Sequence, residues 1–328
     1  MFLQIIIMLV GFVLLVKGAD LLVDGASNIA KKFHIPEIVI GLTIVSIGTS
    51  MPELMVSLTS AVEGHSDISI GNVIGSNIAN LLLILGMCAI IKNLNFKKET
   101  KFFESPFAFI ITILLFIFAN NRIVDQTGTI ARFEGIILVV LCVLFIIYNI
   151  IMAKKGEEFD GISKDLVIVN IEMSTARYTI KSIIFIILGI VCLKFGGDFV
   201  VNSASEIARM LGMSEKLISL TIIAVATSLP ELATSVIATK KGEVDLAIGN
   251  IIGSCIFNIL LIIGVSAIIT PIGYSVSYNK DIICLMVATL FLALFPFIGK
   301  KDEMTRVNGS IYLVGYIAYM ISLIVTNL

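Results

Sequence analysis

The eight residues from Ile47 to Leu54 read IGTSMPEL, and they lie inside a long apolar stretch. A charged side chain at the centre of a membrane costs about 2.5–3.5 kcal/mol on insertion scales. A proline there also removes a backbone hydrogen bond that lipid cannot replace. The same combination returns as VATSLPEL at Val225 to Leu232. Because so unfavourable a segment occurs twice, we expect both copies to have the same functional role.

The composition is that of a polytopic membrane protein. Of the 328 residues, 58% are hydrophobic and only 14% are charged, and the mean hydropathy is +1.05, whereas soluble domains carry about 25% charged residues. The net charge of −1 gives no reason to expect a nucleic-acid partner. The five cysteines stand in apolar segments without paired spacing, which favours packing over metal binding or disulfides.

Apolar runs of membrane-spanning length predict an all-α protein with ten transmembrane helices. Residues 1–16 contain no Lys or Arg, so we interpret the first run as a retained span and not a cleaved signal. The predicted spans are approximately 2–24, 36–62, 68–91, 102–120, 129–152, 179–203, 214–239, 246–269, 280–298 and 307–326.

Lys and Arg placement predicts the orientation. With the N-terminus outside, the cytoplasmic loops hold sixteen Lys and Arg residues and the outer loops hold five, a bias that places both termini outside. The hydrophilic stretch that begins at Lys154 is then a cytoplasmic linker. We therefore expect a first five-helix unit at 1–153, a linker at 154–178 and a second unit at 179–328.

An internal repeat organises the chain. When the sequence is shifted by 178 positions, residues 20–91 meet 198–269 without a gap, and 34 of the 72 positions are identical. Because each half holds five predicted spans, an odd number, the halves are expected to be inverted relative to each other. Inverted repeats with interrupted helices are typical of secondary transporters whose substrate site lies where the breaks meet.

The two interruptions supply oxygen atoms only. Glu53 and Glu231 follow Pro52 and Pro230 directly, and Ser and Asn recur four residues apart in the next span of each half, which places them on one helix face. The hydroxyl and amide candidates are Thr49, Ser50, Ser76, Asn80, Thr227, Ser228, Ser254 and Asn258.

The prolines also bear on the backbone. Each removes a helical hydrogen bond, so carbonyls one turn earlier become available, near Ser46 and Thr49 and near Ala224 and Thr227. The set contains no His or Cys, which argues against zinc or copper. Calcium takes six to eight oxygens, and two carboxylates neutralise one calcium ion. Sodium also prefers oxygen, and magnesium is less favoured because it retains water.

The segments GNVIG and GNIIG contain pairs of glycines four residues apart. We interpret these glycines, Gly71, Gly75, Gly249 and Gly253, mainly as close-packing residues.

These motifs resemble a known family. GTSMPEL with GNVIGSNIAN, and ATSLPEL with GNIIGSCIFN, are similar to the two alpha repeats of prokaryotic sodium/calcium exchangers in the cation/calcium antiporter superfamily. The resemblance covers essentially the whole chain. It implies Glu53 and Glu231 as central carboxylates, with the six hydroxyls as flanking ligands. It also implies that Asn80 and Asn258 line the centre, that the carbonyls of Ser46 and Ala224 complete outer sodium sites, and that three sodium ions exchange for one calcium.

Two positions depart from the family pattern. Ala226 stands where the first half has Gly48, and Asn258 stands where potassium-dependent members have Asp. The missing carboxylate predicts exchange that is independent of potassium, and the run that ends in Glu53 favours sodium over protons.

Three readings follow. The first is a sodium/calcium antiporter that alternates access, functions as a monomer in the cell membrane, exchanges charge and needs no cofactor. The second is a proton/calcium antiporter on the same fold. The third, from another class, is a cation channel, which would more naturally place its pore on an oligomer axis. An enzyme is least expected, because no nucleophile–base pair or cofactor motif occurs.

Overall fold

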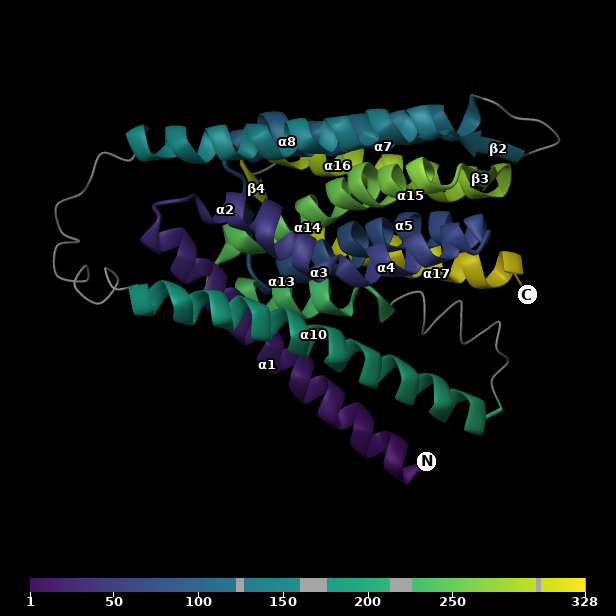
Figure 1. The fold of residues 1–328 in the computed structure, drawn as a ribbon, viewed down its shortest axis with the longest axis horizontal. Helices are drawn as coiled ribbons and strands as arrows, with labels where there is room; N and C mark the ends of the chain where they lie inside the picture. The colour runs from purple at the N-terminus through teal and green to yellow at the C-terminus, as the bar shows by residue number, and fades with distance from the viewer. Residues whose placement is uncertain (122–126, 160–175, 213–225, 299–301, 328) are drawn as a thin grey trace.

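The computed structural model describes residues 1–121, 127–159, 176–212, 226–298 and 302–327, which form long helices that run in roughly one direction (Figure 1). Among these residues, eight helices are long and apolar enough to cross a membrane. A bent pair, Glu37–Thr49 with Met51–Val62, makes a ninth candidate. The structure therefore supports eight or nine of the ten predicted spans. The predicted span at 214–239 is described only from residue 226 onward.

Two long helices form one edge of the molecule. Helices α1 (Phe2–Lys32) and α10 (Ala176–Met210) lie side by side there (Figure 1). Glycines make the contact close: a Cβ on Gly18 would lie 2.9 Å from the Gly189 carbonyl oxygen, and one on Gly189 would lie 2.8 Å from the Gly18 carbonyl oxygen. Small residues allow such backbone contact between membrane helices.

The segment that contains IGTSMPEL is a broken helix. It consists of α2 (Glu37–Ile40), the π-helical turn η1 (Gly41–Val45), α3 (Ser46–Thr49) and α4 (Met51–Val62), with a bend of 49°. Pro52 lies in the first turn of α4, and Pro230 lies in the first turn of α13 (Leu229–Lys241). First-turn amides have no helical acceptor, so a proline there begins a new helix without losing a bond.

Two interrupted helices cross the centre. One runs through α5 (Ser66–Ile78), η2 (Ala79–Leu85) and α6 (Gly86–Ile91). The other runs through α14 (Val244–Phe257), η6 (Asn258–Ile263) and α15 (Gly264–Ile269). In both, a π-helical segment includes the asparagine of the repeat, Asn80 or Asn258. Such π-helical turns are frequent at functional sites.

Helix α14 packs against the broken helix through its glycines. A Cβ on Gly249 would lie 2.5 Å from the Ile38 carbonyl oxygen, and one on Gly253 would lie 2.7 Å from Ser46 Oγ. The close-packing interpretation is confirmed for these two glycines. For Gly71 and Gly75, the corresponding partner segment lies outside the described residues.

The remaining elements surround this centre. Their bounds are η3 Thr100–Glu104, α7 Ser105–Asn120, α8 Arg132–Phe159, η7 Val276–Tyr278, α16 Asn279–Leu294, η8 Phe295–Phe297 and α17 Arg306–Asn327. Short antiparallel strands tie the two ends: β1 (Leu94–Asn95) pairs with β4 (Glu303–Met304), and β2 (Thr127–Ile130) pairs with β3 (Ile272–Ser275). The pairs lie at opposite ends of the molecule, and both termini lie at the β2–β3 end (Figure 1).

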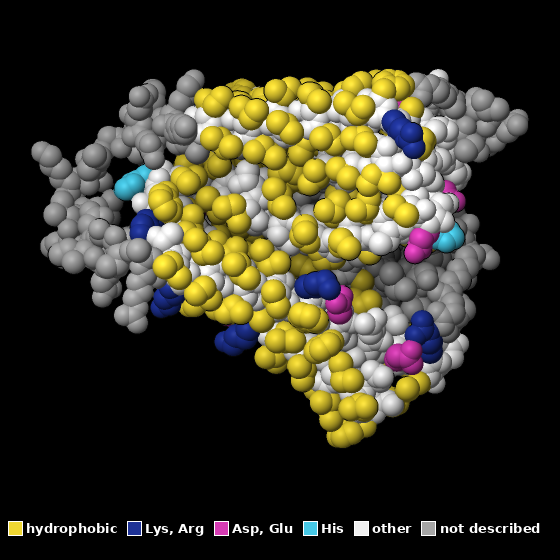
Figure 2. Space-filling view, in the orientation of Figure 1, with side chains coloured by type: hydrophobic (Ala, Val, Ile, Leu, Met, Phe, Trp, Pro, Cys, Tyr) yellow, Lys and Arg dark blue, Asp and Glu magenta, His cyan; other side chains and the backbone are white. Residues whose placement is uncertain are grey.

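The lateral surface is apolar. Figure 2 shows hydrophobic side chains over most of the visible face, with charged side chains mainly toward the ends. Large exposed hydrophobics occur along α1, α8, α10 and α17, as a lipid-facing surface requires. All five cysteines are free, and Cys88, Cys142 and Cys255 are buried, in agreement with a packing role.

Candidate cation site

Two buried carboxylates lie at the centre of the molecule. Glu53 is in the first turn of α4 and Glu231 in the first turn of α13, and both are 0% exposed. Their side chains interact electrostatically with each other. The first turns place both carboxylates at the positive ends of helix dipoles.

Around the carboxylates lie buried oxygens without hydrogen-bond partners. Buried polar atoms in folded proteins almost always have a partner, so a group of exceptions indicates a place for a ligand. Among the described residues the oxygens are both carboxylate oxygens of Glu53, Glu231 Oε2, Asn80 Oδ1, Asn258 Oδ1, Ser228 Oγ and Ser254 Oγ. Such a set suits a hard cation, which binds through oxygen.

The predicted hydroxyls meet across the two halves of the chain. Ser50 Oγ donates to Glu231 Oε1 at 2.8 Å. Ser76 Oγ and Thr227 Oγ1 lie 3.2 Å apart, and both hydroxyls face Glu53. Glu53 is therefore approached by one hydroxyl from each half of the chain, and Glu231 accepts a hydrogen bond from a hydroxyl of the first half.

The two central asparagines have different surroundings. Asn258 Nδ2 donates to Asn77 Oδ1 at 2.9 Å, and Asn77 Nδ2 donates to the Cys255 carbonyl at 3.1 Å. Neither polar atom of the Asn80 side chain has a partner. The difference follows from the repeat, since the residue that corresponds to Asn77 is Cys255, which offers only a thiol.

The predicted backbone ligands are only partly described. The Ser46 carbonyl accepts the amide of Ser50 at 3.0 Å and the hydroxyl of Thr49 at 3.4 Å. It is therefore already hydrogen-bonded, and not left free as the proline argument predicted. Ala224 lies outside the described residues.

Sequence reasoning missed a group of supporting side chains. Asn72 Nδ2 donates to the Glu53 carbonyl at 3.1 Å and to Ser57 Oγ at 2.9 Å, while Asn250 Nδ2 donates to Ser235 Oγ at 2.9 Å. Both asparagines and both serines coincide under the 178-residue shift. That identity was the available signal.

Comparisons with known proteins agree with this geometry. The family model described as sodium/calcium exchanger protein matches residues 3–151 and 181–325, which is most of the chain. The chain belongs to the sodium/calcium exchanger family.

Relatives of this exchanger match over nearly their whole length. It is 40% identical to a putative antiporter, CaxA, of Alkalimonas amylolytica over 96% of both chains. It is 31% identical to the sodium/calcium exchanger MaX1 of Methanosarcina acetivorans over 97% of both chains. Its structure is similar to that of the sodium–calcium exchanger NCX_Mj soaked with Na⁺ and Ca²⁺, with a TM-score of 0.82, 28% identity and 98% of both chains covered. The protein is a cation/calcium antiporter and a multi-pass integral membrane protein.

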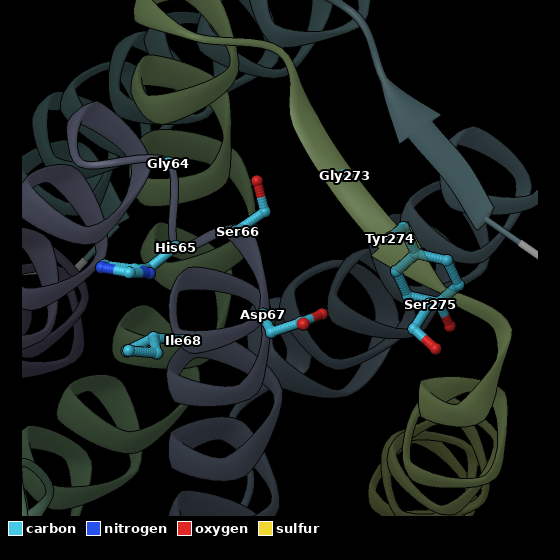
Figure 3. A pocket seen from close by; sticks show the side chains of 8 residues that line it. All are labelled: Gly64, His65, Ser66, Asp67, Ile68, Gly273, Tyr274 and Ser275. Carbon is cyan, nitrogen blue, oxygen red and sulfur yellow. The ribbon is translucent and has the colours of Figure 1, made fainter.

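A cavity lies at the β2–β3 end of the exchanger, between the α4–α5 turn and β3. It measures about 470 Å³, and its lining includes His65, Asp67, Tyr274 and Ser275. Figure 3 shows the Asp67 carboxylate directed toward β3 and the His65 ring directed away from it. Asp67 is exposed and is the only carboxylate among the lining residues. The central site has two buried carboxylates, so this cavity is a weaker candidate for binding a cation.

The turn between α13 and α14 carries a network of charged groups. Ser27 Oγ lies 3.0 Å from Oε1 of both Glu37 and Glu243, and Lys31 Nζ lies 2.9 Å from Glu243 Oε1. Burial alone would raise the pKa of Glu243, but hydrogen bonds with Glu37, Lys31 and Ser27 and the charge of Lys31 hold that pKa below its ordinary value. The network links α1 to the second half of the chain.

Proposed function

We propose that this protein exchanges sodium for calcium by alternating access, with Glu53 and Glu231 binding the transported ion. One observation carries the proposal: two fully buried carboxylates from different halves face each other with several oxygens that lack partners. Two ionised carboxylates supply a charge of −2, which balances one calcium ion. An unpaired buried charge of that size is strongly unfavourable, so the site favours states in which a cation is bound.

The flanking hydroxyls provide places for sodium. Thr49, Ser50, Thr227 and Ser76 lie on the two sides of the carboxylates, and each contacts the other half of the chain. With Ser228 and Ser254, they form a doubled set of neutral oxygen ligands. The Ser46 carbonyl accepts the Ser50 amide at 3.0 Å and the Thr49 hydroxyl only at 3.4 Å, and we assign this oxygen and the Ala224 carbonyl to the outer sodium positions.

The central experiment is calcium uptake into sodium-loaded proteoliposomes. Uptake driven by the outward sodium gradient, and absent when sodium is equal on both sides, is the expected result. Uptake that follows a proton gradient and ignores sodium would instead identify a proton/calcium antiporter. Calcium flux that needs no counter-ion, with unitary currents in planar bilayers, would identify a channel.

We further propose ten spans in two inverted units, 1–153 and 179–328, joined by a cytoplasmic linker, with both termini outside. In support, the α4–α5 turn and the α13–α14 turn lie at opposite ends of the molecule, and the two termini lie at the same end (Figure 1). A cysteine at Glu63, in a background without native cysteines, should react with an impermeant thiol reagent from outside. A cysteine at Lys240 should react only from the cytoplasm, and the reverse pattern would refute the orientation.

Charge balance leads to the remaining proposals. Because Asn258 adds no third carboxylate, exchange should proceed without potassium, and an absolute potassium requirement would contradict this role. Three sodium ions on a −2 site leave a net charge of +1, which couples to membrane potential by about 2.3 kcal/mol per 100 mV. Uptake into sodium-loaded vesicles should therefore accelerate at inside-positive potential. A flat voltage response would mean that two sodium ions exchange for each calcium ion.

We propose that the monomer is the working unit, since one chain supplies both carboxylates.

A further inference from the structure

Two asparagines outside the predicted ligand set contact the threonines of the site. Thr49 Oγ1 donates to Asn250 Oδ1 at 3.1 Å, and Thr227 Oγ1 donates to Asn72 Oδ1 at 3.4 Å. In both cases the threonine belongs to one half of the chain and the asparagine belongs to the other. We propose that Asn72 and Asn250 are positioning residues, each of which orients the threonine hydroxyl of the opposite half for cation binding.

The chemistry of a hydroxyl ligand explains why an acceptor is needed. A hydroxyl binds a cation through its oxygen lone pairs, and its single hydrogen must then point away from the ion. A nearby acceptor that takes this hydrogen keeps the lone pairs directed at the cation. Asn250 Oδ1 lies 3.1 Å from Thr49 Oγ1, nearer than the Ser46 carbonyl oxygen at 3.4 Å.

The amide must also be held in one orientation. A flipped amide would present its NH₂ group to the threonine, occupy the oxygen lone pair and turn the hydroxyl hydrogen toward the ion. Asn72 Nδ2 donates to the backbone carbonyl of Glu53 at 3.1 Å, and a carbonyl can only accept. This contact fixes Oδ1 toward Thr227 and ties the threonine to the backbone that carries a central carboxylate.

The second asparagine is held by the serine that corresponds to Ser57. Asn250 Nδ2 donates to Ser235 Oγ at 2.9 Å, and Asn72 Nδ2 donates to the corresponding Ser57 Oγ, also at 2.9 Å. Asn250, Ser57 and Ser235 are each 0% exposed. Each arrangement is therefore a series of hydrogen bonds that runs from serine through asparagine to the threonine of the other half.

The two series of hydrogen bonds differ in burial and in bond length. Asn250 is fully buried, whereas Asn72 is partly exposed, and Thr227 shares its hydroxyl with Ser76 at 3.2 Å. Thr49 has the shorter bond to its asparagine. We therefore expect loss of Asn250 to affect ion binding more than loss of Asn72.

The proposal rests on the cation site described above, and double-mutant cycles test it separately. The single variants are Asn250→Leu, Asn72→Leu, Thr49→Val and Thr227→Val, and the readouts are the calcium concentration for half-saturation of purified protein with ⁴⁵Ca²⁺ and the sodium concentration that displaces half of it. Each single variant should weaken binding roughly 3- to 10-fold, the range expected for one hydrogen bond.

The pairing of the variants decides between positioning and general packing. Asn250→Leu with Thr49→Val, and Asn72→Leu with Thr227→Val, should weaken binding no more than the stronger single change. The mismatched combinations, Asn250→Leu with Thr227→Val and Asn72→Leu with Thr49→Val, serve as controls in which the two effects should multiply. If the matched pairs multiply as the mismatched pairs do, the positioning role is wrong.

A milder variant covers the case in which Asn250→Leu does not fold. Ser235→Ala leaves Asn250 in place but frees its amide, so binding should weaken about 3-fold, and this effect should vanish in Thr49→Val protein. An unchanged effect in that background would also refute the proposal. Glu53→Gln separates the two levels: if that variant exchanges and binds calcium normally, the proposed function itself fails, whatever the cycles show.

Discussion

The two halves of the site carry nearly the same residues and differ in how these are held. In one, Glu231 accepts a hydrogen bond from Ser50; in the other, the matching serine, Ser228, has no hydrogen-bond partner among the described residues and does not reach Glu53. Asn258 is fixed by Asn77, whereas Asn80 is free. Because the ligand types are the same, the difference lies in their neighbours. A duplicated motif can thus supply two kinds of position, one held by hydrogen bonds within the protein and one that is not.

The strongest test of this comparison removes one carboxylate at a time. Glu53→Gln and Glu231→Gln should each lower sodium-driven calcium uptake by about 100-fold or more. Removing one carboxylate leaves part of the charge of the buried calcium ion unbalanced, and the loss of one partner from a buried charge pair costs roughly 3 kcal/mol or more. Initial ⁴⁵Ca²⁺ uptake measures this. Exposed Glu63→Gln, at the end of the same helix, is the control and should exchange normally. Full activity in either central variant would remove that carboxylate from the site.

The next test concerns the two serines. Ser50→Ala removes a donor from the Glu231 carboxylate, and a hydrogen bond to a charged group contributes about 1.5–3 kcal/mol. We expect roughly a 10-fold or greater loss in apparent calcium affinity. Ser228→Ala, whose hydroxyl has no partner, should cost about 3-fold or less. Equal losses in calcium titrations of uptake would show that the halves are equivalent during transport.

A smaller effect is expected from exchanging the neighbours of the asparagines. Cys255→Asn would give Asn80 the kind of partner that Asn258 already has, and we expect a shift of about 2- to 10-fold in half-saturating calcium or sodium. Asn77→Cys should shift the same quantities by freeing Asn258. Cys142→Ala, which changes a buried cysteine of α8 outside the predicted ligand set, provides the control. No shift in either variant would mean that these amides do not contact the ions.

The smallest expected effect is a change in the pH dependence of stability, and it concerns the α13–α14 and α4–α5 turns. Glu243 at the first turn corresponds to His65 at the second. Because the pKa of Glu243 is lowered in the folded protein, its stabilising contribution is complete above the ordinary glutamate pKa of about 4.3. It is lost as pH falls through the folded value. The melting temperature of the purified protein should therefore drop slightly less between pH 5 and pH 3 in Glu243→Gln than in wild type.

His65→Gln is the matched control for that measurement, because His65 lies at the opposite turn and its ring points away from β3 in Figure 3. The drop in melting temperature between pH 5 and pH 3 should be unaltered by the histidine change. An identical drop in wild type and Glu243→Gln would show that the network around Lys31 adds no stability.

Much of this arrangement could be predicted from the sequence, and the reasons are physical. A carboxylate next to a proline in an apolar span is so unfavourable that it marks both a helix break and a binding site, and Glu53 and Glu231 are indeed at the first turns of helices and buried together. Long apolar runs likewise identified the helices. The repeat placed Thr49, Ser50, Ser76 and Thr227 in the same neighbourhood.

Other features were not predictable because they depend on contacts between the halves. The sequence contains both Asn72 and Asn250, but nothing local shows that each accepts a hydrogen bond from the threonine of the other half. Likewise the proline argument pointed to a free Ser46 carbonyl, while the turn at Ser50 returns an amide to it. Helix packing and backbone turns decide such details.

The crossed bonds between threonines and asparagines have a consequence for the origin of the chain. A half-length protein with one copy of the motif would hold a threonine whose acceptor lies on a different copy, because Asn72 serves Thr227 and Asn250 serves Thr49. Such a protein could complete the arrangement only by pairing with a second molecule of itself. Fusion of two such genes would make that partnership permanent, and it would then free positions such as 77 and 255 to diverge.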